Sequence, residues 1–344
     1  LTMLNDFNLN EVSLATGMPP RVAGNLDYIN KLQYVLARRK GTNLDTLFTA
    51  VYEPYRDNRY ISSVDSVPAV VLDGSKSSKD KVKAVKVTLA NRRLDYVIYS
   101  TNNKVKYRID DMFNFRGFVG VYTVKDGRPV YSYLNDGDII GESQNNTAAY
   151  IGKVLDFTRE PAFENSITVQ FDSEVQPDKL SGKCIHIAND RAENAVYRIE
   201  SAVPEEGNKF KLNLGNNTLI RSYIDANDIY GGYIYNITAG QSFKIPLSTE
   251  EDNSPVFQGI VPRTVYADTA ISFRASAVSP VGKKLAYRAV VLPRGAVFNA
   301  ETQTFYWVPD SSQIGDNVAA IEASDGDMAV TAYYKIKVLP HVSD

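Results

Sequence analysis

Short runs of apolar residues, separated by polar turns, recur along most of this 344-residue chain. Within many runs apolar and polar side chains alternate, imperfectly in Val82–Leu89, and the runs are bounded by Gly, Asn, Asp or Pro. A period of two residues is typical of strands that bury one face, and these end residues are typical of turns. The 22 Tyr and 14 Phe suit strands as well. The pattern predicts an all-β protein built from antiparallel sheets.

One segment fits two patterns. Leu26, Ile29, Leu32 and Leu36 recur at helical spacing, whereas Tyr34–Ala37 reads equally well as a strand. Extended helical patterns are nearly absent elsewhere in the sequence. We favour a strand here, on the basis of a family resemblance described below.

Turn chemistry divides the chain into three units. Residues 1–147 read as a meander of strands, with a hairpin turn at Lys125–Arg128 and a strand at Thr46–Tyr55 that Pro54 ends. Residues 148–252 read as a small β-barrel or sandwich, closed by strands at 231–237 and 242–247. The stretch Ser248–Pro255 is polar and acidic and ends in Pro, so we expect a linker there, before a third unit at residues 253–344.

The third unit contains a hairpin that can be read directly from the sequence. Pro293 and Gly295 mark a turn, Val297 and Phe298 begin a strand, residues 299–303 form a polar turn, and Thr304–Val308 is a second strand stopped by Pro309. We expect Trp307 to anchor the core of this unit, because the single cysteine of the chain allows no disulfide.

The hairpin resembles a known module. Its segments Leu292–Phe298 and Phe305–Pro309 are similar to the hallmark of immunoglobulin-like (cadherin-like) modules of bacterial surface proteins. Such modules are spacers or binders. The resemblance therefore implies that residues 253–344 form an immunoglobulin-like sandwich attached to something larger.

An ordered series of earlier motifs resembles a second family. Tyr34–Arg39, Leu47–Tyr55, Phe115–Phe118 and Tyr131–Gly137 look like the trailing β-region of heparinase II/III-like polysaccharide lyases. The resemblance covers about residues 1–250, since 231–237 and 242–247 also look like the end of such lyases.

This resemblance implies a parent protein with an N-terminal catalytic α/α-toroid, a β-sandwich and smaller β-domains, which cleaves acidic, uronate-containing polysaccharide by β-elimination. The family's Tyr and His catalysts lie in the toroid and early sandwich, so we expect them upstream of Leu1 and assign no catalytic residue here. Its structural metal site needs paired histidines, but this chain has only His186 and His341, far apart in sequence. We expect the chain alone to be inactive.

Charge and composition limit the classes of binding partner that we expect. A net charge of -2 with interspersed signs gives no long-range field for nucleic acid or an anionic membrane surface. No apolar run approaches the length of a membrane-spanning helix, and residues 1–10 lack the pattern of a signal peptide. Because position 1 is not Met, we expect part of a longer, extracellular or cell-surface protein, with neither nucleic-acid binding nor membrane insertion.

Cationic and aromatic residues near strand ends are the substrate-binding candidates. Arginine can pair with a uronate carboxylate through two hydrogen bonds, and tyrosine can stack on a sugar ring. The alternative is that these residues only hold the sandwich together and contact a catalytic toroid. The candidates are Arg38, Arg39, Tyr55, Arg56, Tyr60 and Arg116.

The sequence offers two other candidate sites, one for a metal ion and one for a reactive thiol. Asp225, Asn227 and Asp228 concentrate oxygen donors that could hold a structural calcium, although their spacing matches no calcium loop and we favour turn formation as their role. No cofactor is otherwise expected. Cys184 lies in an apolar run, so we expect a buried thiol rather than a nucleophile, and His186 two residues later to be a packed or rim side chain.

Three functions remain open from the sequence. The first is the noncatalytic C-terminal portion of a secreted bacterial lyase, which braces and spaces the catalytic toroid. The second is a carbohydrate-binding or adhesion surface protein without catalytic activity. The third is a purely structural surface-layer repeat.

Overall fold

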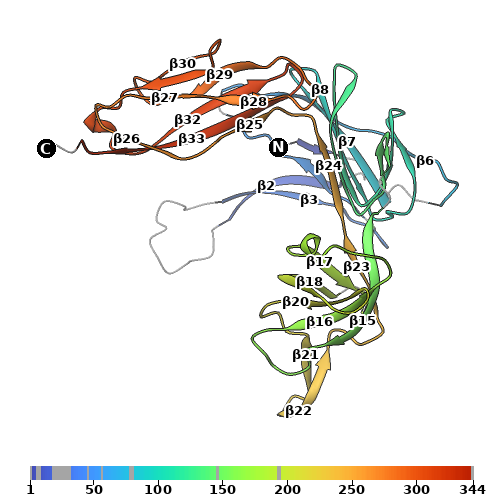
Figure 1. The fold of residues 1–344 in the computed structure, drawn as a ribbon. Helices are drawn as coiled ribbons and strands as arrows, with labels where there is room; N and C mark the ends of the chain where they lie inside the picture. The colour runs from blue at the N-terminus through green and yellow to red at the C-terminus, as the bar shows by residue number, and fades with distance from the viewer. Residues whose placement is uncertain are drawn as a thin grey trace.

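A computed structural model describes residues 2–4, 9–17, 32–44, 46–55, 57–76, 81–144, 147–191 and 195–341. Within these ranges the chain is all-β, as predicted, because its regular elements are strands apart from short 3-10 helices. None of the described helices is long and apolar enough to cross a bilayer. Figure 1 shows a β-sandwich, a second domain below it, and an elongated C-terminal module.

The sandwich is made from a six-stranded sheet of order β24-β12-β11-β8-β7-β5 and a five-stranded sheet of order β14-β13-β10-β9-β6. Buried side chains of both sheets, such as Tyr96 and Ile98 on β8 and Phe115 on β10, form its core. The predicted turn is confirmed, since Asp126 and Gly127 have φ of 48° and 78° between β11 and β12. The strands of the sandwich are β5 (Ile61–Ser66), β6 (Ala69–Val71), β7 (Val82–Leu89), β8 (Arg93–Ser100), β9 (Tyr107–Ile109), β10 (Phe113–Arg116), β11 (Val119–Lys125), β12 (Arg128–Asn135), β13 (Ile139–Gly141), β14 (Ser143–Gln144) and β24 (Ser248–Asp252).

Two separate ribbons precede the sandwich. Strands β2 (Glu11–Gly17) and β3 (Leu32–Arg38) form one, which confirms a strand at Tyr34–Ala37, and residues 26–31 of the ambiguous segment lie outside the described ranges. Strands β1 (Thr2–Leu4) and β4 (Thr49–Val51) form the other. The long strand expected at Thr46–Tyr55 is therefore wrong beyond the three residues of β4.

The second domain is inserted into the sandwich. Its seven-stranded sheet has the order β18-β17-β23-β15-β16-β20-β19, and its core includes Ile185, Ile187 and Phe243. The chain enters it after β14 and returns from β23 directly into β24, which pairs with β12. The linker expected at Ser248–Pro255 is thus wrong for residues 248–252, which form an edge strand of the sandwich. The strands of the sheet are β15 (Ala149–Phe157), β16 (Ser166–Phe171), β17 (Cys184–Ile187), β18 (Ala195–Arg198), β19 (Ser201–Pro204), β20 (Lys209–Asn213) and β23 (Ser242–Pro246).

A two-stranded hairpin, β21 (Ile220–Asp225) and β22 (Asp228–Tyr235), projects from the inserted domain (Figure 1). Residues 231–235 of the strand expected to close the barrel at 231–237 are part of this arm instead and pair with β21, whereas Ile237 is buried in the domain core. Tyr223, Tyr233 and Tyr235 follow one another, with ring centroids 5.9 and 6.5 Å apart, and Tyr235 contacts Phe157 at 5.2 Å. Aromatic contacts therefore tie the arm to the domain.

The C-terminal module is a sandwich with sheets of order β26-β33-β32-β29 and β27-β31-β30, and an extra pair, β25-β28. Strands β26 and β33 pair in parallel. The predicted hairpin is confirmed as β30 and β31, and Trp307 is fully buried with its indole N–H donating to the Arg294 carbonyl at 3.1 Å. The strands are β25 (Val256–Gln258), β26 (Arg263–Tyr266), β27 (Ile271–Arg274), β28 (Ser276–Val278), β29 (Ala286–Val291), β30 (Val297–Asn299), β31 (Thr304–Trp307), β32 (Gly315–Ser324) and β33 (Ala329–Leu339).

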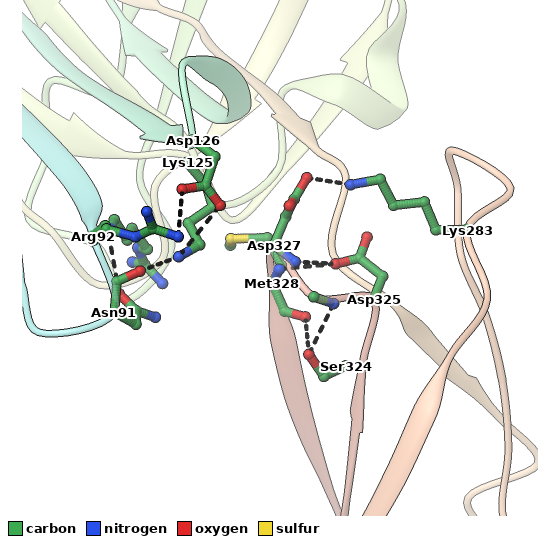
Figure 2. A network of polar contacts seen from close by, with 11 residues as sticks. Asn91, Arg92, Lys125, Asp126, Lys283, Ser324, Asp325, Asp327 and Met328 are labelled. Atoms are coloured by element: carbon green, nitrogen blue, oxygen red, sulfur yellow. Dashed lines mark hydrogen bonds and ion pairs between the residues drawn. The ribbon is translucent and has the colours of Figure 1, made fainter.

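Turns of the sandwich and of the C-terminal module lie beside one another (Figure 2). On the sandwich, Lys125 donates to the Asn91 carbonyl, and Arg92 pairs with Asp126 at 3.4 Å. On the module, the Met328 amide donates to Asp325 at 2.8 Å. The polar contacts drawn join groups within the sandwich or within the module, while the Met328 side chain is directed toward the sandwich turns (Figure 2).

Candidate functional site

Two of the six substrate-binding candidates share a neighbourhood. The Glu53 carboxylate accepts hydrogen bonds from Arg59 Nε at 2.6 Å and from the Tyr60 and Ile61 amides at 2.8 and 2.7 Å. The Arg59 guanidinium lies 5.8 Å from the centre of the Tyr55 ring. The Ile61 amide, together with Arg59 and Tyr60, lowers the pKa of Glu53. Tyr55 and Tyr60 therefore flank a local ion pair and are both exposed.

The arginine candidates have partners of their own. Arg38 pairs with Glu11 across the β2-β3 ribbon at 3.4 Å, and Arg39 donates to the Thr46 hydroxyl at 2.8 Å. Arg116 forms a two-pronged salt bridge with Asp138, with Nε at 2.6 Å from the carboxylate. Arg56 lies outside the described residues. These contacts bring together only Tyr55 and Tyr60, and substrate binding by the six stays a prediction.

The calcium candidates lie at the exposed tip of the β21-β22 arm. Asp225 Oδ1 accepts the Asn227 amide at 2.9 Å, and Asp228 Oδ1 accepts the Tyr230 amide at 3.0 Å. Such bonds from a side chain to an amide two residues on are the usual chemistry of turns. The described residues contain no group of three potential metal ligands of the Asp, Glu, His or Cys type.

The most developed polar site lies where the inserted domain joins the sandwich. A cavity of about 540 Å³ opens there. The sandwich contributes Phe118, Asn135 and Asp136. The inserted domain and its exit segment contribute Lys183, Cys184, His186, Lys244, Pro246 and Ser248. We call this cavity the junction cleft.

A tight turn presents Asp136 to the cleft. Its φ of 47° is left-handed, a conformation that Asp tolerates better than most residues. A Cβ on the next residue, Gly137, would lie 2.3 Å from the Arg116 carbonyl oxygen, so only glycine fits there. The Asp136 amide donates to the Leu247 carbonyl at 2.9 Å, and the Leu247 amide donates to the Ala148 carbonyl at 3.0 Å. Backbone bonds thus fix both connecting segments beside the cleft.

The Asp136 carboxylate is held by a cation and an amide. It accepts a hydrogen bond from Asn103 Nδ2 at 2.8 Å and forms a salt bridge with Lys244 of β23. The Asp136 side chain is 9% exposed and that of Lys244 is 37% exposed. Because a buried carboxylate requires a partner, this pair links the two domains through charge as well as through backbone.

Strand β17 supplies the opposite wall. Its side chains alternate, with Ile185 and Ile187 buried in the domain core and Cys184 and His186 on the cleft side. Cys184 is exposed, so the expectation of a buried thiol is wrong. The reason is that the two isoleucines take the core face of the strand. His186 does line the rim, as the sequence suggested.

Two lysines, one carboxylate and one histidine set the electrostatics of the cleft. Burial lowers the pKa of His186, the charge of Lys244 lowers it further, and Asp136 opposes both. Cys184 and His186 line the same cleft, two residues apart on β17. The arrangement can place cations, an amide and an aromatic ring around a ligand.

Sequence reasoning missed this site because its members come from three distant segments. One signal was available: His186 alternates with Ile185 and Ile187, and isoleucine is buried more often than histidine, which also assigns Cys184, two residues before His186, to the outer face. The pairing of Asp136 with Lys244 has no such signal, since 108 positions separate them.

Comparison with known proteins identifies the C-terminal module. Residues 254–339 match a family whose description is "Putative Ig domain". The chain is thus all-β and ends in an immunoglobulin-like domain, as predicted. No curated protein matches the sequence.

Solved structures give weak similarities. An endo-fucoidan hydrolase, MfFcnA4 from glycoside hydrolase family 107, is 10% identical over 82% of this chain and 39% of its own, with a TM-score of 0.24. The Ig1-2 module of the Drosophila receptor protein tyrosine phosphatase DLAR is 10% identical over 57% of this chain and 100% of its own, with a TM-score of 0.20. The titin fragment I67-I69 is 11% identical over 80% and 98%, with a TM-score of 0.19. At these TM-scores the similarities identify no function.

Proposed function

We propose that this chain is the noncatalytic C-terminal β-region of a secreted bacterial polysaccharide lyase of the heparinase II/III type. In the full-length protein an N-terminal toroid would cleave acidic, uronate-containing polysaccharide by β-elimination. The sandwich and inserted domain would brace that toroid, and the immunoglobulin-like module would space it from the cell surface.

The β2-β3 ribbon is the observation that carries this proposal. Leu14 is 76% exposed, and the consecutive residues Tyr34, Val35 and Leu36 are 42%, 39% and 47% exposed. Because successive strand residues point to opposite faces, the ribbon is apolar on both sides. Exposed apolar surface of this kind marks a site where another protein surface packs.

The ribbon also separates this proposal from an adhesion protein that needs no further domain. An adhesion protein would gain nothing from two uncovered apolar faces, whereas a bracing element buries them against its neighbour. Burying one leucine side chain contributes about 1.5–3 kcal/mol. The ribbon could thus stabilise a neighbouring domain appreciably.

The proposal is tested with Leu14→Glu combined with Leu36→Glu, which changes both faces. Within the 344-residue chain these residues are exposed, so the melting temperature should stay the same. Within the full-length polypeptide the catalytic domain should melt earlier and lose activity. Ile224→Glu on the projecting arm, where Ile224 is 66% exposed, is the matched control. A full-length double variant as stable and active as the control would refute the bracing role.

A further inference from the structure

The junction cleft carries an excess of positive charge. Lys183 and Lys244 line it against a single carboxylate, Asp136. Lys244 is paired with that carboxylate, while Lys183 forms no salt bridge within the described part of the chain. In a protein whose net charge is -2, this local excess favours an anionic ligand.

One wall of the cleft is aromatic. Phe118 is 37% exposed, and its ring makes an edge-to-face contact with Tyr99, with 5.2 Å between centroids and 64° between ring planes. A fixed ring next to polar groups is typical of sites that bind the apolar face of a ring-shaped ligand.

Neutral hydrogen-bonding groups complete the wall. Asn135 Nδ2 donates to the Ser248 hydroxyl at 2.9 Å, and the Tyr133 hydroxyl lies 3.0 Å from the same oxygen. These bonds orient the Asn135 amide and leave its carbonyl oxygen without a donor among the described residues. That oxygen can accept a hydrogen bond from a ligand hydroxyl.

We propose that the junction cleft binds an acidic sugar, a pyranose that carries a carboxylate or a sulfate group. Lys183 and Lys244 contact the charged group, Phe118 packs against the ring, and Asn135 accepts from a ring hydroxyl. The site goes beyond the bracing role and does not depend on it, because all its residues lie within this chain.

Cys184 is a reporter built into the site. It is the only cysteine of the chain, it is exposed, and it lines the cleft. A bound sugar should therefore slow its reaction with a disulfide reagent such as DTNB. The rate is measured against the concentration of digalacturonate, of glucose 6-sulfate and of cellobiose, all at one ionic strength.

The acidic sugars should protect Cys184 in a saturable manner and cellobiose should not. The acid that protects at the lower concentration identifies the preferred group. Lys183→Ala should weaken protection about tenfold, the effect of one charge-assisted hydrogen bond. Phe118→Leu should weaken protection by both acids several-fold.

Lys209→Ala is the control, since Lys209 is an exposed lysine of the same domain that does not line the cleft. Circular dichroism melting checks that each variant is folded. Equal protection by cellobiose, no protection by either acid, or full protection in a folded Lys183→Ala variant would overturn the proposal. The result bears only on the cleft, so it is independent of the ribbon experiment.

Discussion

The carboxylate of Asp136 on the sandwich forms a salt bridge with Lys244 of the inserted domain, although 108 positions separate the two residues. Asp136 is the more buried partner, with 9% of its side chain exposed against 37% for Lys244. The two partners should therefore respond differently to substitution.

Lys244→Met leaves a buried carboxylate without a cation. It should lower the free energy of unfolding by about 2 kcal/mol, less than for a fully buried pair because the lysine is partly exposed. Asp136→Asn should cost less than about 1 kcal/mol, because Lys244 can turn to water and Asn tolerates the left-handed backbone. The double variant should recover most of the loss. Chemical denaturation, followed by fluorescence, measures all three. Equal losses for the two single variants would argue against a buried charge at Asp136.

The pKa of the His186 imidazole should reflect the charges of Lys244 and Asp136. Its pKa lies below the ordinary value of 6.5, first because of burial and then because of Lys244, with Asp136 opposing. The unfolded chain then binds this proton more readily than the folded chain. The stability that neutral His186 contributes is thus present above pH 6.5 and lost as pH falls through the lowered pKa.

NMR can follow this titration directly, because the chain has only two histidines. His186 should titrate below pH 6.5, and His186→Gln should flatten the decline of stability below that pH. A His186 midpoint at or above that value would contradict the buried position of the ring.

The edge strand β24 gives a prediction about truncation. A chain that ends after Ser254 keeps β24 and loses only the immunoglobulin-like module, so it should stay folded and soluble. A chain that ends after Leu247 exposes the edge of β12, and open sheet edges promote aggregation. Size-exclusion chromatography of the two chains compares them. Equal solubility would show that β24 is dispensable.

Trp307 should dominate the stability of the module. Trp307→Ala empties a fully buried site and should cost about 3–5 kcal/mol. Tyr306→Ala, on the opposite face of β31 where Tyr306 is 46% exposed, should cost under about 1 kcal/mol. Calorimetry should show one transition moving to lower temperature in the Trp307 variant. Similar shifts in both variants would contradict the assigned core.

Local features were the predictable part of this fold. The hairpin around Trp307 and the turn at Asp126–Gly127 follow from neighbouring residues, and both are confirmed. β24 could not be predicted, because Glu250, Glu251 and Asp252 have low strand propensity. Its pairing depends on tertiary contacts, such as the hydrogen bond from the Tyr131 hydroxyl to Glu250 at 2.9 Å.

The candidate site was also predictable from the sequence only in part. The sequence proposed residues by chemical type, such as Arg116, but could not show that Asp138 already occupies its guanidinium. The junction cleft required knowledge that the second domain is inserted, since only the return of the chain through β23 and β24 brings Lys244 to Asp136.

The most direct test of the account is whether this chain has lyase activity of its own. The purified 344-residue chain is incubated with glycosaminoglycans and alginate, and the ultraviolet absorbance of unsaturated uronate is followed. We predict no product from this chain and clear product from the full-length polypeptide. Sustained formation of unsaturated uronate by the 344 residues alone would contradict this prediction.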